Sequence, residues 1–108
     1  MTQQAWAFLG GKQVPQVDAK VGVMTHALHY GTAVFEGIRG NWNEHLGKLV
    51  VFRLREHYER LLRGCKILRV ELPYSVNDLC KITIDLIEAN GHREDVYIRP
   101  LAFKGQEA

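Results

Sequence analysis

The segment Tyr30–Gly40, with the sequence YGTAVFEGIRG, constrains the fold of this chain more than any other. Along a β-strand, side chains alternate between two faces. One face carries Val34, Glu36 and Ile38, and the other carries Phe35, Gly37 and Arg39. A core strand needs large apolar side chains on its buried face, and only the first face comes close to supplying them. The second face combines an aromatic ring, a gap and a guanidinium group, which is typical of a site wall for a partly apolar anion.

Length and charge narrow the possible classes of protein. The chain has 108 residues, enough for one domain with a modest core. Its 14 basic and 12 acidic residues give a net charge of +2, which does not indicate nucleic-acid binding. No run approaches the ~18 apolar residues of a membrane span, and the N-terminus lacks an apolar secretory segment. Cys65 and Cys80 form no C-x-x-C pair, so we expect reduced thiols in a cytoplasmic protein.

The remaining patterns predict an α/β (α+β) domain of two layers, with a largely antiparallel sheet and helices packed on one face. Strands are expected at 5–9, 12–15, 31–40, 48–52 and 95–103, with a polar hairpin loop at 41–47. Pro100 lacks an N–H group, so the last strand should end, bulge or lie at an edge there. We treat 1–108 as one domain, because the chain has no repeat, low-complexity segment or linker.

Two helices are predicted, at 53–68 and 75–90. The first has an apolar stripe formed by Leu54, Tyr58, Leu61, Cys65 and Leu68. Arg53, His57 and Arg60 follow one flank of that stripe. The second helix begins at Ser75, where Ser75–Asp78 resembles a capping box with Asp in place of Glu, and it directs Leu79, Thr83, Leu86 and Ile87 inward. Gly91 is its C-terminal stop.

Three groups of residues allow two interpretations each. The spacing His26-x-x-His29 fits a metal site, but no Cys or carboxylate cluster accompanies it, so we favour hydrogen-bonded structural histidines. Tyr97 and Arg99 share a strand face, as Phe35 and Arg39 do. An arginine fork binds carboxylate or phosphate, yet surface salt bridges on a solvated face explain the same spacing. Arg60 is either a solvent-exposed charge or a phosphate anchor.

Three motifs resemble one known family. Residues 23–39 (VMTHALHYGTAVFEGIR), 51–61 (VFRLREHYERL) and 97–101 (YIRPL) are similar, in the same order, to the N-terminal small domain of branched-chain amino acid aminotransferases. These are class IV aminotransferases with fold type IV that use pyridoxal 5'-phosphate. The resemblance implies amino transfer between leucine, isoleucine or valine and 2-oxoglutarate. It also implies a homodimer or a larger homo-oligomer.

The resemblance also implies roles for individual residues. Arg60, which closes the E-H-x-x-R-L motif, would hold the cofactor phosphate. Tyr97 would help to bind the substrate α-carboxylate. Arg99, with Tyr30 from a neighbouring subunit, would meet the distal carboxylate of glutamate. Phe35 and Gly37 would border the pocket for the branched side chain. Arg39 would support the polar side of the site.

One departure and one gap limit the resemblance. After Arg39 the chain continues Gly40-Asn-Trp-Asn, where many family members have a small residue and then tyrosine, so the side-chain preference is left open. No lysine here matches the family's Schiff-base lysine, which belongs to the C-terminal domain. We therefore expect this chain alone to be inactive. The alternatives are a D-amino acid aminotransferase, aminodeoxychorismate lyase, or a non-catalytic binding or assembly module.

Overall fold

The computed structural model describes residues 4–105 and gives a mixed α/β fold with antiparallel strands, as the sequence predicted. The order of its elements is β1 (Trp6–Leu9), β2 (Lys12–Pro15), a 3-10 turn η1 (Gln16–Asp18), α1 (His26–Tyr30), β3 (Ala33–Phe35), β4 (Ile38–Asn43), β5 (Lys48–Val51), α2 (Leu54–Leu68), α3 (Val76–Asn90), β6 (Val96–Ile98) and β7 (Leu101–Phe103). Both predicted long helices are present, and each starts one residue later than expected.

The central strands form one antiparallel ladder with an interruption in its middle. β3 pairs with β7, β4 pairs with β6, and both pairings continue the same register. Between them, the Glu36 N–H donates to the Pro100 carbonyl at 3.1 Å, and Pro100 has no N–H to return a bond. The predicted end of the strand at Pro100 is confirmed. The single strand expected over 31–40 is corrected, because it is divided between β3 and β4 opposite that proline, and β4 continues to Asn43.

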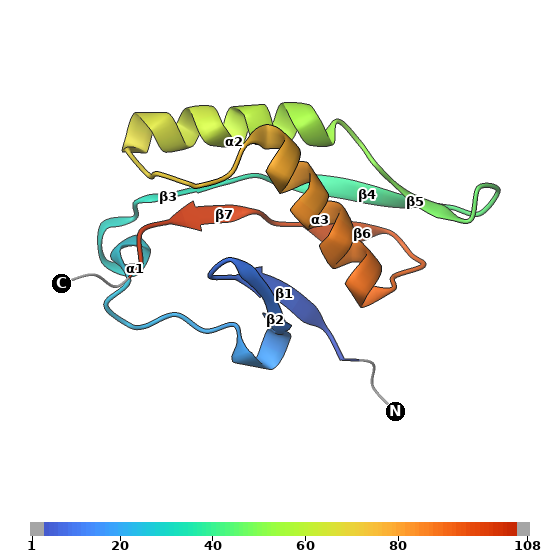
Figure 1. Ribbon diagram of the computed structural model, residues 1–108, viewed down its shortest axis with the longest axis horizontal. Helices are drawn as coiled ribbons and strands as arrows, with labels where there is room; N and C mark the ends of the chain where they lie inside the picture. Colours follow the sequence, from blue (N-terminus) through green and yellow to red (C-terminus); the bar gives the residue numbers. More distant parts are fainter. Residues whose placement is uncertain (1–3, 106–108) are drawn as a thin grey trace.

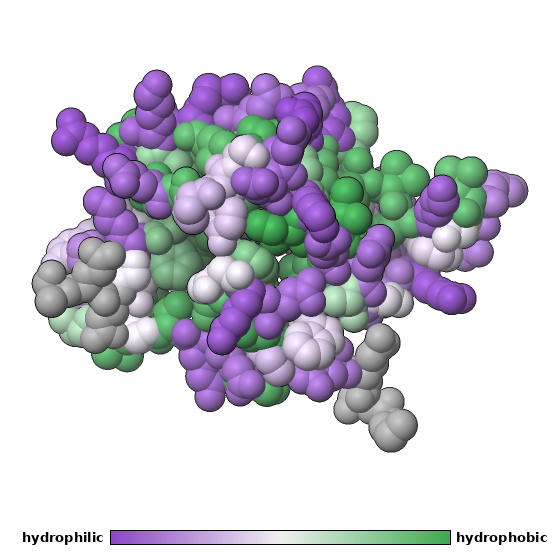
Figure 2. Space-filling view, viewed as in Figure 1, coloured by the Kyte–Doolittle hydropathy of each residue, from purple (hydrophilic) through white to green (hydrophobic). Residues whose placement is uncertain are grey.

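Both long helices lie on the same side of these strands, as predicted (Figure 1). The buried apolar residues between the helices and the strands are Ile38, Tyr58, Leu61, Cys65, Val70, Leu79 and Ala102. They include three members of the predicted α2 stripe. Leu68, the last member, is 40% exposed, because α2 ends at that residue and the chain turns away through Arg69. Figure 2 shows hydrophilic residues over the outer side of α2, opposite this core.

A glycine sets how closely α2 approaches β3. A Cβ atom at Gly64 would lie 2.7 Å from Cγ1 of Val34, closer than side chains tolerate. The backbone of α2 can therefore rest against Val34 only because position 64 has no side chain. This contact fixes the height of α2 above the strand that leads to Glu36.

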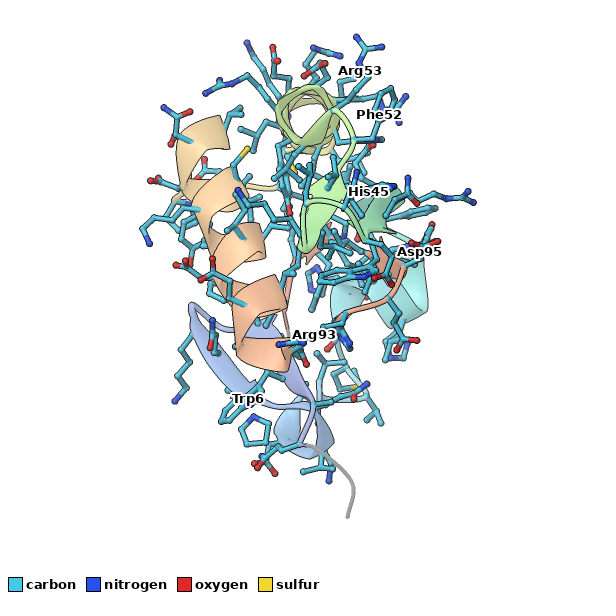
Figure 3. All side chains as sticks on the ribbon, turned by 90° about the vertical axis from the view of Figure 1, so that its right-hand side faces the viewer. Trp6, His45, Phe52, Arg53, Arg93 and Asp95 are labelled. Atoms are coloured by element: carbon cyan, nitrogen blue, oxygen red, sulfur yellow. The ribbon has the colours of Figure 1, made fainter. Side chains whose placement is uncertain are left out.

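Polar contacts fix both ends of α3. α3 begins with the predicted capping box, in which Ser75 Oγ accepts from the Asp78 N–H at 3.1 Å and Asp78 Oδ2 accepts from the Ser75 N–H at 2.9 Å. At its other end, Asn90 Oδ1 accepts from the Trp6 N–H at 2.9 Å and Asn90 Nδ2 donates to the Trp6 carbonyl at 3.1 Å, which ties the β1–β2 hairpin to α3. Figure 3 shows Trp6 on this hairpin, below the end of α3. Within residues 4–105, no helix is long and apolar enough to cross a membrane.

Candidate functional site

The face of the ladder that the helices leave uncovered carries the side chains predicted to lie there. Phe35 is 56% exposed and Tyr97 is 63% exposed. Gly37, Arg39 and Arg99 lie on the same face. The alternate residues, such as Ile38, are turned towards the helices and the core. The two-faced pattern of the segment is therefore confirmed.

Arg99 is the centre of this open face. Its guanidinium lies 4.4 Å from the centroid of the Phe35 ring and 5.3 Å from that of the Tyr97 ring. Its Nη2 atom also donates to the Tyr97 hydroxyl at 2.7 Å. Cation–π contacts favour this position by about 0.5–1 kcal/mol each at exposed sites. The result is a cation held against aromatic surface, with most of its N–H donors still available.

Gly37 leaves the space that the Tyr97 side chain occupies. A Cβ atom at this position would lie 2.2 Å from the Tyr97 hydroxyl oxygen. Arg39 lies directly across the ladder from Tyr97. Among the described residues, neither Arg39 nor Arg99 forms an ion pair. The alternative explanation of the spacing, in which Arg39 and Arg99 form surface salt bridges, finds no such ion pair among the described residues.

Tyr30 does not join this group. It belongs to α1 and is 71% exposed, and its ring contacts the rings of His26, at 5.3 Å between centroids, and His29, at 6.2 Å. His29 Nε2 lies 2.6 Å from the Val23 carbonyl. The contact with Val23 agrees with the structural interpretation of His29, whereas the contact that the structure gives for His26 is the one with the Tyr30 ring. Among residues 4–105, no group of three or more His, Cys, Asp or Glu side chains could hold a metal ion.

Arg60 is also separate from the open face, since it lies on α2, on the helix side of the ladder. Its Nε atom donates to Glu36 Oε2 and its Nη2 atom donates to Glu36 Oε1, both at 2.8 Å. His57 Nδ1 donates to the same Oε1 atom, also at 2.8 Å. The carboxylate of Glu36 is buried, whereas the Arg60 side chain is 64% exposed.

Glu36 is the functional-site candidate that sequence reasoning missed. Its hydrogen bonds from Arg60, and then from His57, outweigh the effect of burial and lower its pKa to about 2. A signal was present in the sequence, because Glu36 occupies a core-facing position that a charge can hold only with a partner. His57 and Arg60, on one flank of the next helix, are the partners.

A basic depression of about 270 Å³ lies beside His57 and Arg60. Its lining residues are Arg53, Glu56, His57, Arg60 and Arg63. Arg53 and Phe52 lie where β5 leads into α2, on the side away from α3 (Figure 3). Arg53 already has an acidic partner, because its Nε atom donates to Glu56 Oε2 at 2.8 Å. The donor set of this depression suits a phosphate group, because Arg60 keeps unused N–H groups.

Comparison with known proteins assigns this chain to a family. The family model for amino-transferase class IV matches residues 33–108. A probable branched-chain-amino-acid aminotransferase of Aquifex aeolicus is 49% identical over 98 residues, which cover 91% of this chain and 32% of that protein. The branched-chain-amino-acid aminotransferase of Escherichia coli K12 is 47% identical over 100 residues, covering 93% of this chain and 31% of that protein.

Solved structures agree with these relatives. A branched-chain aminotransferase of the thermophilic archaeon Thermoproteus uzoniensis, with norvaline, superposes with a TM-score of 0.89 at 43% identity, covering 97% of this chain and 35% of that one. The T.th. branched-chain amino acid aminotransferase, complexed with N-(5'-phosphopyridoxyl)-L-glutamate, gives 0.88 at 40% identity, covering 100% of this chain and 35% of that one. The chain therefore spans about a third of the length of the relatives that it matches.

Proposed function

Because this chain belongs to the class IV aminotransferase family, we propose that it is the N-terminal small domain of a branched-chain amino acid aminotransferase. The complete protein would transfer the amino group of leucine, isoleucine or valine to 2-oxoglutarate, giving the branched 2-oxo acid and glutamate. The observation that carries this proposal is the position of Arg99, held against the Phe35 ring without an acidic partner among the described residues. A carboxylate and an apolar side chain can both be accommodated beside such a group.

The proposed cofactor is pyridoxal 5'-phosphate, bound through its phosphate at Arg60. When bound, it would supply the electron sink that amino-group transfer requires. The basic depression beside Arg60 supports this assignment, since its donors fit a phosphate. The related T.th. structure is complexed with a phosphopyridoxyl compound. The lysine that binds the cofactor would lie outside these 108 residues.

The residues of the open face would orient the substrate. Tyr97 would donate to the α-carboxylate, and Arg99 would meet the distal carboxylate of glutamate. Phe35 and Gly37 would border the branched side chain. Arg39 would serve the polar side of the pocket.

Tyr30 supports a proposal about assembly. It is exposed on α1 and has no contact with Phe35, Tyr97 or Arg99 among those the structure describes. We infer that it completes the site of a neighbouring subunit, which requires a homodimer or a larger homo-oligomer.

The deciding experiment uses the full-length protein and measures three reactions. We expect amino transfer from L-leucine and L-valine to 2-oxoglutarate. Amino transfer from D-alanine alone would assign the protein to the D-amino acid aminotransferases, and release of pyruvate from aminodeoxychorismate would assign it to the lyases. Failure of all three reactions, with cofactor present, would favour a binding or assembly module.

Substitution at Arg99 tests the proposed pocket in the same assay. The Arg99→Ala variant should lose more activity with glutamate than with leucine, because only glutamate has a distal carboxylate for the guanidinium to bind. Equal losses with the two substrates would contradict the proposed role of Arg99.

A further inference from the structure

We propose that Glu36 is a positioning residue, which holds the Arg60 guanidinium in the orientation that a cofactor phosphate requires. This inference rests on the proposed role of Arg60 in the function described above. Glu36 is not among the residues that line the basic depression, and its carboxylate offers no donor to a phosphate. Glu36 is 6% exposed, and both of its carboxylate oxygens are turned to α2.

Two parallel hydrogen bonds fix the plane of the guanidinium. Glu36 occupies the edge of Arg60 formed by Nε and Nη2, with both bonds at 2.8 Å. A guanidinium has five N–H groups in a rigid fork. Glu36 uses two of them, so the second N–H of Nη2 and the adjacent N–H of Nη1 are left to form another edge, and the remaining Nη1 N–H points to the Cδ side. That edge can bind a second anion with two bonds while Glu36 stays in place.

The carboxylate is itself held at a fixed place in the fold. The Glu36 N–H donates to the Pro100 carbonyl, which anchors residue 36 in the ladder. Two residues earlier, Val34 lies against Gly64, one helical turn after Arg60. Two strand residues span ~6.7 Å, and one turn of four helical residues spans ~6 Å. The Val34–Gly64 and Glu36–Arg60 contacts are therefore separated by nearly the same distance along the strand and along α2.

His57 restricts the carboxylate further. Its Nδ1 atom donates to Glu36 Oε1, the oxygen that also accepts from Arg60 Nη2. Rotation of the carboxylate would break bonds to both partners at once. Without these contacts, a side chain as exposed as Arg60, at 64%, samples many rotamers and must be ordered when phosphate binds. Pre-organisation removes that cost from binding.

Charge and position make opposite predictions for Glu36, which allows a sharp test. Glu36 is an anion beside a phosphate site, so by charge alone its removal should tighten phosphate binding. If Glu36 positions Arg60, its removal should weaken binding, since the amide group of Gln places a donor where one carboxylate oxygen had accepted. The sign of the effect separates the two roles.

The test measures dissociation constants of the full-length apoprotein for pyridoxal 5'-phosphate and for pyridoxal, which lacks the phosphate. We expect Glu36→Gln to weaken binding of pyridoxal 5'-phosphate about tenfold, a loss of the size that follows when a group orienting a metal ligand is removed. Binding of pyridoxal should stay unchanged. In an Arg60→Ala background, Glu36→Gln should cause no further loss, because the residue through which Glu36 acts is gone.

Glu56→Gln is the matched control. Glu56 lines the same depression, but its carboxylate accepts from Arg53 and not from Arg60. The substitution removes the same charge, so the affinity for pyridoxal 5'-phosphate should stay equal to that of the parent or rise. A tenfold loss in this control as well would overturn the inference, because the effect would then not depend on Arg60.

The outcomes separate this inference from the proposed function. If Arg60→Ala leaves the affinity for pyridoxal 5'-phosphate unchanged, the proposed phosphate role of Arg60 is wrong, and the inference falls with it. If Arg60→Ala weakens binding but Glu36→Gln does not, only the inference is wrong. Should Glu36→Gln fail to fold, nuclear magnetic resonance of the Arg60 Nε–H in the unaltered apoprotein decides. We expect an ordered signal before ligand is added, and a motionally averaged signal would overturn the inference.

Discussion

At the scale of single residues, Glu36 links the acid stability of the protein to one contact. Its pKa is lowered from 4.5 to about 2 by Arg60 and His57, so the folded state favours the ionised carboxylate. A lowered pKa contributes stability that is present above the unfolded pKa and is lost as the pH falls through the folded pKa. The stabilising contribution of Glu36 should therefore be lost between about pH 4.5 and pH 2.

We expect this component to be on the order of 3 kcal/mol, since each unit by which the pKa of Glu36 is lowered corresponds to about 1.4 kcal/mol. The measurement is the free energy of unfolding by urea at several pH values, for the parent and for Glu36→Gln. The variant should be less stable at pH 7 but should lose less stability on acidification. Parallel pH profiles for the two proteins would show that Glu36 does not carry the effect.

Gly37 provides a second prediction at this scale. In Gly37→Ala, the new Cβ would meet the Tyr97 hydroxyl at 2.2 Å, so the Tyr97 ring must leave the position in which it accepts from Arg99. Because the Tyr97 and Arg99 side chains lie on the open face, thermal stability should change little, by less than ~1 kcal/mol. The Michaelis constants for the amino acid substrates of the full-length enzyme should rise several-fold. A variant with unchanged constants would contradict the placement of Tyr97 in the substrate site.

These residues also show what alternation along a strand can predict. It correctly placed Phe35, Gly37 and Arg39 on one face, because side-chain direction follows from local backbone geometry. The pattern did not identify Glu36 as paired, because its partners come from a helix more than 20 residues later in the chain. Such a contact depends on how α2 sits on β3, which local pattern does not determine.

At the scale of elements, the packing of α2 on β3 depends on Gly64. Gly64→Ala gains up to about 1 kcal/mol of helix propensity, but its Cβ would lie 2.7 Å from Val34 Cγ1. Overpacking of this kind typically costs about 1–3 kcal/mol, so we expect a net destabilisation in urea unfolding. The control is Gly64→Ala combined with Val34→Ala, which removes the clashing methyl groups. The double variant should then lose less stability than the two single effects add up to, and strict additivity would contradict the close contact.

The strands show a limit of prediction at the same scale. Pro100 indicated a break in its own strand, since a residue without an N–H cannot complete a ladder. The matching break at Glu36–Gly37 could not be predicted, because it arises from the partner across the ladder. Pairing between strands about 60 residues apart must be known before the effect of one on the other can be seen.

At the scale of the whole molecule, we propose that these 108 residues supply one side of a site. The sequence predicted the two layers and the open face, and the resemblance indicated the family that the comparisons then showed. The chain spans about a third of its relatives, and the relation between the open face and the Arg60 depression depends on what else surrounds them. No pattern within residues 4–105 can reveal those surroundings.

One prediction belongs to this scale. The isolated 108-residue chain should show no transaminase activity with leucine and 2-oxoglutarate, and no absorbance band of lysine-bound cofactor when pyridoxal 5'-phosphate is added. The physical reason is that, under the proposed function, the amine which must bind the cofactor covalently would lie outside it. The full-length protein is the positive control. A borohydride-trapped adduct at one specific lysine of the isolated chain would contradict the prediction.

Phe35 and Gly37 are separated in the sequence by Glu36 alone, and this has a consequence for protein engineering. These two residues form part of the open face, while Glu36 between them bonds to α2 on the opposite side. Adjacent residues thus face the open face and the Arg60 side of the ladder. A backbone shift introduced to reshape the open face will therefore also move Glu36. Libraries designed to alter substrate range should therefore leave 35–37 intact. They should diversify Leu101 instead, which is 52% exposed and lies across the ladder from Phe35.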